Sequence, residues 1–150
     1  MSEPAWTDSG RWRALRDGSE CPICLRGGPR DIVAELAATW VSAPPRAALP
    51  GYACVVSKQH AVEPFELPSA DRAAFWDDAM AVARALAALF EPVKMNYEIH
   101  GNVIPHLHLH LYPRYVGDPF ATGALRPHED AFLRTEEDLT RMAVAIRSAA

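Results

Sequence analysis

The stretch His106-Leu107-His108-Leu109-His110-Leu111-Tyr112 alternates histidine with an apolar residue. Side chains two residues apart on a β-strand point to the same face. A strand here therefore has its imidazoles on one face and its leucines on the other. The leucines can bury against a core, while the imidazoles face a cleft, a metal ion or one another. Three of the six histidines of the chain lie in this stretch, which makes it the first candidate for chemistry.

Strand geometry limits what these three side chains can share. The first and the third lie about 13 Å apart along a strand, which is four rises of ~3.3 Å. A zinc ion binds imidazole nitrogen at about 2.0–2.1 Å, so one ion cannot comfortably reach all three without a bend in the strand. We therefore expect the outer and the central histidines to have different tasks.

The segments around this stretch have the patterns of further strands and of two helices. We expect strands over 32–36, 39–42, 52–57, 93–100 and from 103 or 106 to 112, where Pro113 closes the last one, and helices over about 69–90 and 136–148. Strands, then one long helix, then two more strands predict an α+β fold with a mostly antiparallel sheet of about five strands, one long helix and a C-terminal helix. One long helix cannot cover both faces of the sheet, so we expect dimerisation or the terminal segments to cover the rest.

Length and charge limit the class of protein. A chain of 150 residues fits one domain over residues 1–150. Its 15 basic and 19 acidic residues give a formal net charge of −4 at pH 7, which argues against nucleic acid and membrane surfaces as partners. A small anionic ligand remains compatible, because a few local donors are enough to bind it.

The location of the protein is predicted from what the sequence lacks. No apolar run approaches the ~18–20 residues of a transmembrane helix. The first residues, Met1–Trp6, lack the basic and apolar regions of a signal peptide. Three cysteines, an odd number, fit poorly with a disulfide framework. We therefore expect a cytoplasmic protein.

An imidazole on this strand can act as a nucleophile or as a metal ligand. A neutral imidazole can attack phosphorus directly and form a covalent intermediate, while its other nitrogen keeps a proton on a carbonyl group. A second histidine nearby can donate hydrogen bonds to the phosphate oxygens. Alternatively, two neighbouring histidines can hold a catalytic zinc ion.

The stretch matches at every position the His-φ-His-φ-His-φ-φ signature (φ apolar) of the histidine triad superfamily, which the chain resembles over residues 21–120. Asn96 upstream, the segment Gly101–Pro105 and the dipeptide Pro113-Arg114 extend the resemblance. Members of that superfamily are nucleotide hydrolases or nucleotidyl transferases that act at an α-phosphate.

The resemblance implies a role for each of these residues. His108 is the nucleophile that forms a nucleotidyl-histidine intermediate, and His110 contacts the phosphate and helps expel the leaving group. Asn96 lies near the ribose or phosphate, and Asn102 stands where many members have a glutamine that binds the leaving group. The substrate is a dinucleoside polyphosphate, a nucleoside phosphoramidate or an adenylylated small molecule. A homodimer without an organic cofactor is implied as well.

A second motif, Cys21-Pro22-Ile23-Cys24, is compatible with a redox pair, half of a zinc site or two ordinary cysteines. The Gly27-Gly28-Pro29 stretch that follows argues against the long helix of a redox site. The resemblance implies a structural zinc whose other ligands are His60 and His106. His100 is the alternative fourth ligand.

Two further functions stay open. One is a nucleotide-binding regulatory module with little turnover, and the other is a zinc-dependent hydrolase in which two histidines of the stretch hold a catalytic ion.

Three other reactive or charged residues have simpler structural interpretations. We expect Cys54 to be a buried small apolar residue and His128 to be a solvated loop residue. Arg114 either contacts substrate or forms a surface ion pair.

Overall fold

The computed structural model describes residues 3–126 and 131–150, so His128 lies outside the described residues. In chain order the elements are η1 (Ala5–Thr7), α1 (Ser9–Arg16), α2 (Pro22–Arg26), β1 (Ile32–Glu35), β2 (Thr39–Ser42), β3 (Arg46–Ala47), β4 (Ala53–Ser57), η2 (Pro64–Glu66), α3 (Ser69–Phe90), β5 (Lys94–Glu98), β6 (His108–Arg114), β7 (Phe132–Leu133) and α4 (Glu136–Ala149).

The main sheet has five strands in the order β1-β2-β4-β6-β5, and every neighbouring pair is antiparallel. The predicted α+β fold, with a five-stranded antiparallel sheet, one long helix and a C-terminal helix, is confirmed. β5 and β6, which follow one another in the chain, pair antiparallel. A second, two-stranded sheet of β3 and β7 was not predicted, because two residues per strand are too few to make a pattern.

The histidine strand differs from its predicted bounds at both ends. It begins at His108, so His106 lies just before it, and it continues through Pro113 to Arg114. The prediction that Pro113 closes the strand is wrong. β4 pairs with β6 only as far as Leu111, whereas Pro113 pairs with Met95 of β5 on the other side. A proline, which has no N–H to donate, is tolerated where one side of the strand is unpaired.

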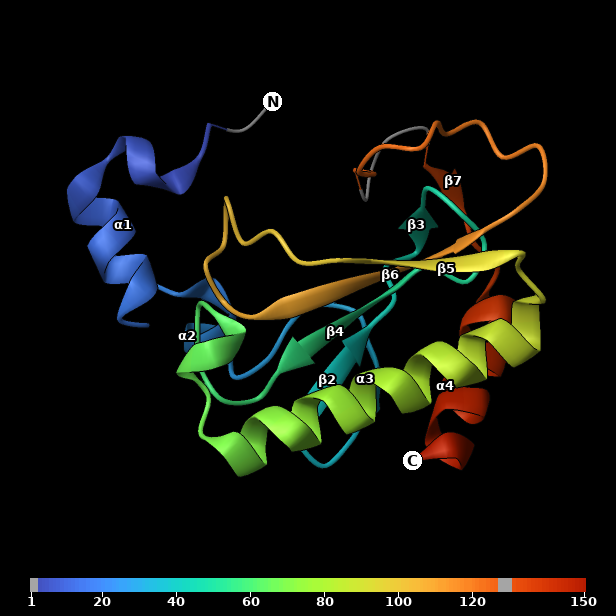
Figure 1. Cartoon of the computed structure of the whole chain (residues 1–150), viewed down its shortest axis with the longest axis horizontal. Coiled ribbons are helices and arrows are strands. Elements are labelled where there is room, and N and C mark those ends of the chain that lie inside the picture. The colour runs from blue at the N-terminus through green and yellow to red at the C-terminus, as the bar shows by residue number, and fades with distance from the viewer. Residues whose placement is uncertain (1–2, 127–130) are drawn as a thin grey trace.

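The leucine face of β6 forms part of the main core, as the alternation predicts. Leu107, Leu109 and Leu111 are at most 1% exposed and pack in one cluster with the apolar faces of α3 and α4. Burial of one such side chain is worth about 1.5–3 kcal/mol. Figure 1 shows α3 and α4 side by side on this side of the sheet. The packing of this face fixes the opposite face as the histidine face.

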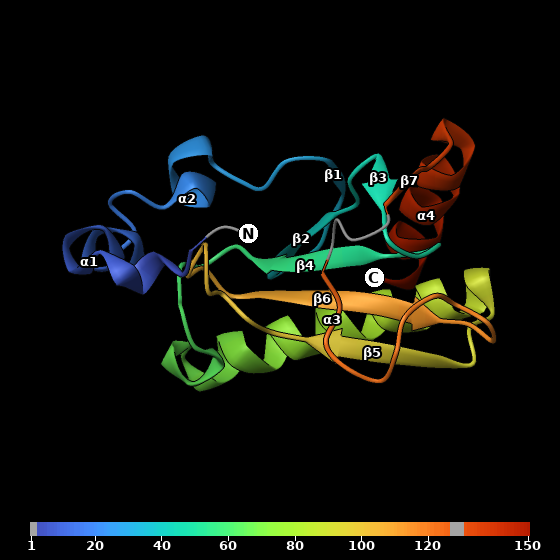
Figure 2. The same cartoon turned by 90° about the horizontal axis from the view of Figure 1, so that it is seen from above.

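The opposite face is covered by the N-terminal segment and by loops. Cys21 and Ile23 of the α2 segment join Leu49, Leu125 and residues of β4 and β6 in a second buried cluster. The expectation that a terminal segment covers this face is therefore confirmed, whereas dimerisation stays a prediction. Cys54 is 8% exposed within the same cluster, as expected. Figure 2 shows α1 and α2 at one end of the sheet and α4 at the other.

None of the helices in the described part of the chain combines the length and apolar character needed to cross a membrane.

Candidate functional site

Four side chains that are far apart in the sequence meet at the end of the sheet where α2 lies. The ligand atoms of Cys21, Cys24, His60 and His106 all lie within 4.8 Å of one another. The two cysteines are three residues apart on a short helical turn, so they share one side of it. This helix starts with Pro22 and ends at Gly27, whose φ of 80° is the left-handed conformation that glycine adopts readily. His60 follows β4, and His106 precedes β6.

Backbone carbonyls set the orientation of both histidine rings in this cluster. His106 donates its Nε2–H to the carbonyl oxygen of Ser57 at 2.8 Å. His60 donates its Nε2–H to the carbonyl oxygen of Arg16, also at 2.8 Å. Because a carbonyl can only accept, each ring has its hydrogen on Nε2 and a lone pair on Nδ1. Metal-binding histidines are held in this way by a hydrogen bond from the second ring nitrogen.

The distances within the cluster suit a tetrahedral ion. The Nδ1 atom of His106 lies 3.4 Å from Cys21 Sγ and 3.6 Å from Cys24 Sγ, and the Nδ1 atom of His60 lies 3.3 Å from Cys24 Sγ. Bonds of about 2.3 Å to sulfur and 2.0–2.1 Å to nitrogen, at tetrahedral angles, require nitrogen and sulfur ligands to lie about 3.5 Å apart. These four residues could therefore hold a metal ion.

The protonation of Cys24 fits the same conclusion. Burial and the neighbouring Cys21 sulfur raise the pKa of the Cys24 thiol to about 11. Without a cation, Cys24 is therefore a neutral thiol at pH 7, and a bound metal would replace its proton. His100, the alternative fourth ligand, lies outside this cluster. It is exposed, and its Nε2 lies 3.0 Å from the carboxylate of Glu98.

His108 lies on the histidine face with one ring nitrogen fixed. Its Nδ1–H donates to the carbonyl oxygen of His106 at 2.6 Å. The lone pair is therefore on Nε2. Burial lowers the pKa of His108, and the hydrogen bond to the His106 carbonyl opposes that shift only in part. The ring is thus neutral at pH 7, which is the form a nucleophilic imidazole needs.

His110 lies next to His108 and is enclosed by aromatic rings. The ring centroids of His108 and His110 are 4.9 Å apart. The His110 ring stacks on Tyr52 and on Tyr112 at 6.0 and 5.9 Å, and the Tyr52 hydroxyl lies 2.8 Å from His110 Nδ1. The two neighbouring histidines of β6 therefore have separate partners, one a backbone carbonyl and the other a phenol.

The two predicted asparagines lie at different distances from the histidine face. Asn96 on β5 pairs with Tyr112 of β6, so its side chain shares the face of the histidines. Its Oδ1 accepts a hydrogen bond from Arg114 at 2.9 Å. Asn102 is exposed in the loop before His106, and its backbone carbonyl accepts a hydrogen bond from the Ala5 N–H.

Arg114 forms a partly buried ion pair instead of a surface one. It makes two hydrogen bonds of 2.8 Å to Asp118, and it also donates to the carbonyl oxygens of Phe120 and Ala121. These hydrogen bonds hold the pKa of the Asp118 carboxyl well below its ordinary value. The cluster fixes the loop after β6 against the end of β5.

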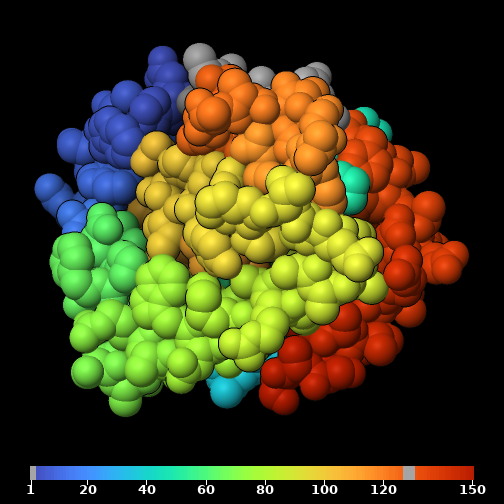
Figure 3. Space-filling view, turned by 45° about the vertical axis from the view of Figure 1, so that its right-hand side comes forward, coloured from blue at the N-terminus to red at the C-terminus, as the bar shows by residue number. Residues whose placement is uncertain are grey.

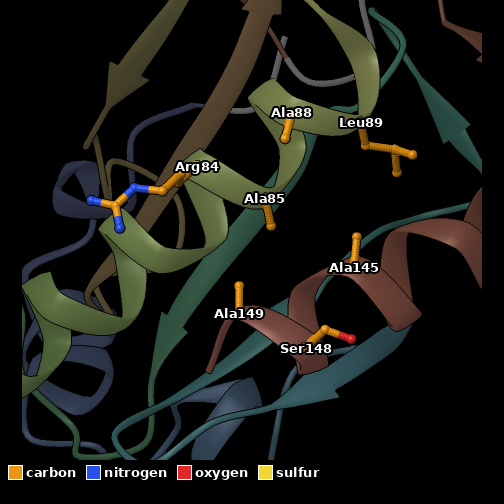
Figure 4. Close-up of a pocket in the computed structure, with 7 residues that line it drawn as sticks. All are labelled: Arg84, Ala85, Ala88, Leu89, Ala145, Ser148 and Ala149. Carbon is orange, nitrogen blue, oxygen red and sulfur yellow. The ribbon is translucent and has the colours of Figure 1, made fainter.

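The surface also has a groove that is remote from these histidines and cysteines. An open groove between α3 and α4 is lined mainly by small apolar side chains, with no cysteine or histidine (Figure 4). Its lining residues are Arg84, Ala85, Ala88, Leu89, Ala145, Ser148 and Ala149. The groove contains none of the candidate histidines and cysteines, so the histidine face remains the candidate site.

Two residues of the site were not predicted from the sequence, namely Tyr52 and Arg134. Tyr52 immediately precedes β4, and period-two alternation places it on the face of Cys54, which pairs with His110. That register could have indicated Tyr52. Arg134 is 5% exposed and donates to the carbonyl oxygens of Pro44 and Tyr52. No sequence pattern indicates this buried arginine, because its partners are backbone atoms remote in the chain.

Three solved structures of histidine triad proteins have a fold similar to that of this chain. A histidine triad protein from Sinorhizobium meliloti has 25% identity, a TM-score of 0.70, and coverage of 81% of this chain and 91% of its own. A Zn-bound histidine triad family protein from Mycobacterium smegmatis has 21% identity, a TM-score of 0.62, and coverage of 85% and 91%. A hypothetical histidine triad nucleotide-binding protein from Sulfolobus tokodaii has 21% identity, a TM-score of 0.61, and coverage of 86% and 89%.

No curated protein matches the chain. The sequence model of the HIT domain family matches residues 29–117, which is more than half of the chain and includes β6 with its histidines. The chain belongs to the HIT domain family.

Proposed function

We propose that the protein is a nucleotide hydrolase or nucleotidyl transferase that acts at an α-phosphate through a covalent nucleotidyl-histidine intermediate on His108. Membership of the HIT family supports a nucleotide-binding, hydrolase or transferase role in general. The observation that supports the finer proposal is the hydrogen bond of 2.6 Å from His108 Nδ1 to the His106 carbonyl. It leaves the Nε2 lone pair of a neutral ring as the group that can attack phosphorus.

The proposed reaction has two displacements. The Nε2 lone pair of His108 forms a bond to the α-phosphorus, and the bond from phosphorus to the leaving group breaks. The electron pair of that bond stays with the leaving group, which takes up a proton. Water, or an acceptor hydroxyl in a transferase, then attacks the phosphorus and releases a proton. The phosphorus–nitrogen bond breaks in this second step, and its electron pair returns to Nε2.

Three neighbours have proposed roles in substrate binding. His110, with its ring 4.9 Å from that of His108, would contact the phosphate and assist departure of the leaving group. The Asn96 side chain, on the same face, would lie near the ribose or phosphate. The exposed Asn102 would reach the leaving group from the loop before His106. The substrate class stays a dinucleoside polyphosphate, a nucleoside phosphoramidate or an adenylylated small molecule.

We propose zinc for the cluster of Cys21, Cys24, His60 and His106. Two thiolates and two imidazoles are a donor set typical of structural zinc. The ion would join the α2 segment to the start of β6 and would have no open position for a substrate. This closed donor set argues against the zinc-dependent hydrolase, because neither His108 nor His110 belongs to it. Cysteines that bind metal and form no disulfide suit the reducing cytoplasm, where we place the protein.

We further propose a homodimer that uses the outer edge of β5. This strand stands at the end of the sheet, and β6 is its one strand partner among the described residues. Tyr97 on this strand is 46% exposed, and Val93 just before it is 68% exposed. Figure 3 shows the β5 region (yellow) at the surface beside α3. Sedimentation should give a dimer for the protein and a smaller species for Tyr97→Lys.

The test of the main proposal is a product assay with adenosine and guanosine 5′-phosphoramidates and diadenosine polyphosphates. Samples quenched in alkali, which preserves phosphorus–nitrogen bonds, are analysed by intact mass. We expect nucleoside monophosphate as product and a transient mass increase of one nucleotidyl group. Both should be absent in His108→Ala, with an unchanged thermal unfolding temperature. Full turnover in His108→Ala would overturn the proposal. Nucleotide binding without turnover or adduct would instead favour the regulatory module.

A further inference from the structure

The Tyr52 side chain has a single described hydrogen-bonding contact, which is with a histidine of the triad. Its hydroxyl lies 2.8 Å from His110 Nδ1, and Tyr52 is 3% exposed. The Tyr52 ring stacks on the Tyr112 ring at 4.9 Å and on the His110 ring at 6.0 Å. Tyr52 is thus buried and the contact itself is partly buried, with stacked aromatic rings beside both partners.

We propose that Tyr52 is a positioning residue that donates its hydroxyl hydrogen to His110 Nδ1 and so holds His110 in the tautomer with hydrogen on Nε2. That His110 then donates to a phosphate oxygen rests on the proposed function; the tautomer itself does not.

The direction of this hydrogen bond follows from the single hydrogen of a phenol. If His110 Nδ1 carried the hydrogen, the Tyr52 hydroxyl would accept it, and its own hydrogen would have no acceptor among the described residues. A buried donor without a partner loses the hydrogen bond that it makes with water in the unfolded chain, which is unfavourable. If Tyr52 donates instead, its hydrogen is paired and the Nδ1 lone pair is used. The second arrangement pairs the buried hydroxyl hydrogen of Tyr52, so it is the stable one.

The phenol is held in place by Arg134. The Arg134 guanidinium donates to the Tyr52 carbonyl oxygen at 2.6 Å, and its Cζ lies 5.9 Å from the centre of the Tyr52 ring. The same guanidinium donates to the Pro44 carbonyl oxygen. A cation near the ring favours donation by the phenol hydroxyl over acceptance.

The result is a pair of neighbouring histidines in opposite tautomers. His108 has its hydrogen on Nδ1, facing the His106 carbonyl, and its lone pair on Nε2. His110, held by Tyr52, has its lone pair on Nδ1 and its hydrogen on Nε2. One ring is then prepared to attack phosphorus and the other to donate to phosphate oxygens, with no rearrangement of protons before reaction.

The tautomer is tested by NMR of protein labelled with ¹⁵N-histidine, with the His110 signals assigned by their loss in His110→Asn. We expect an unprotonated Nδ1 and a protonated Nε2 at His110 in the wild-type protein. In Tyr52→Phe the signals should shift toward a mixture of tautomers. The matched control is Tyr112→Phe, which keeps the stacked rings and removes a buried hydroxyl that has no hydrogen-bond partner among residues 3–126 and 131–150. This control should keep the wild-type tautomer.

The consequence is tested with adenosine 5′-phosphoramidate as the probe. Tyr52→Phe should lower kcat by about tenfold or more with little change in KM. The reason is that part of the molecules would then have the His110 hydrogen on Nδ1, so that Nε2 cannot donate to the reacting phosphate. Tyr112→Phe should keep the wild-type kcat.

A protonated Nδ1 at wild-type His110 would overturn the inference, and this measurement needs no variant. Equal tautomers and equal kcat in Tyr52→Phe and Tyr112→Phe would overturn it as well. If the wild-type protein turns over no member of the substrate panel, the proposed function fails, while the NMR result still decides the tautomer.

Discussion

The Nδ1 atoms of His60 and His106 lie 3.1 Å apart, although neither of them carries a hydrogen. Each ring has its hydrogen on Nε2, in a bond to a backbone carbonyl. Two nitrogen lone pairs that face each other at this distance repel unless a cation or a proton lies between them. The sulfur atoms of Cys21 and Cys24 close the same space. The arrangement is stable when a metal ion occupies the centre.

We therefore predict that Cys21→Ala lowers zinc from about one ion per chain to a small fraction and also lowers stability. Removing a ligand weakens an ion that joins the α2 segment to the start of β6, so several kcal/mol of folding free energy are expected to be lost. Metal analysis of untagged protein and thermal unfolding measure the two effects.

Cys54→Ala is the matched control, because it removes a buried cysteine outside the cluster. It should lose stability through the cavity left behind while keeping its zinc. The zinc assignment is wrong if wild-type protein purified with zinc in the medium contains none, or if Cys54→Ala loses as much metal as Cys21→Ala.

The metal cluster shows which parts of the site could be predicted from the sequence and which could not. The strand alternation predicts the two faces of β6 from residues next to one another in the chain, because period two is a local property. The four residues of the metal cluster could not be grouped by a local pattern, because Cys21 and His106 lie 85 positions apart. Only the resemblance to the histidine triad superfamily joined them. The carbonyls of Arg16 and Ser57, which orient the two rings, have no signature in the sequence at all.

A second prediction concerns Arg114 and Asp118. A double-mutant cycle with Arg114→Ala and Asp118→Ala should give a coupling free energy of about 1–3 kcal/mol in urea unfolding, because the pair makes two hydrogen bonds with side chains that are only 14% and 5% exposed. The comparison pair is Arg16 and Glu66, at 3.5 Å with 49% and 33% exposure, for which less than about 1 kcal/mol is expected. Similar coupling for both pairs would contradict the argument from burial.

A third prediction concerns alkaline stability and Cys54. Burial raises the pKa of the Cys54 thiol from 9.0 to about 12. The folded protein therefore keeps the proton that the unfolded chain releases above pH 9. The stability that this thiol contributes is fully present below pH 9 and is lost as the pH rises toward 12.

Between these limits the unfolding free energy of the wild-type protein should fall more steeply with pH than that of Cys54→Ala, by up to about 1.4 kcal/mol per pH unit. The slopes are compared, so the constant cost of the cavity in the variant cancels. Urea unfolding at several pH values measures both slopes. Parallel slopes would show that the Cys54 thiol does not titrate differently in the two states.

Tyr52 and Pro113 show why other parts of the site escaped prediction. The tyrosine immediately precedes β4, a strand whose residues are buried on both faces, so nothing in its own segment marks it as polar in function. Its role depends on the register between β4 and β6, and strand register cannot be read directly from the sequence.

Pro113 was misread for a different reason. A proline usually ends a strand, but the ladder to β4 has already ended at Leu111, and the strand continues beside β5 alone.

The last prediction compares two glycines that have the same backbone conformation. Gly51 and Gly117 have φ values of 78° and 79°, so an alanine at either position should lose about 1–2 kcal/mol through left-handed strain alone. At Gly51 an added Cβ would also lie 2.7 Å from Phe90 Cδ2 and 3.0 Å from Pro113 Cγ, whereas at Gly117 it would meet nothing within 4 Å. Gly51→Ala should therefore be the more destabilising by about 1–3 kcal/mol in urea unfolding. Because Gly51 precedes Tyr52, the shift it forces should also disturb the ¹⁵N signals of His110, and Gly117→Ala should leave them in place. Equal losses of stability would mean that the ring of Phe90 moves aside at little cost.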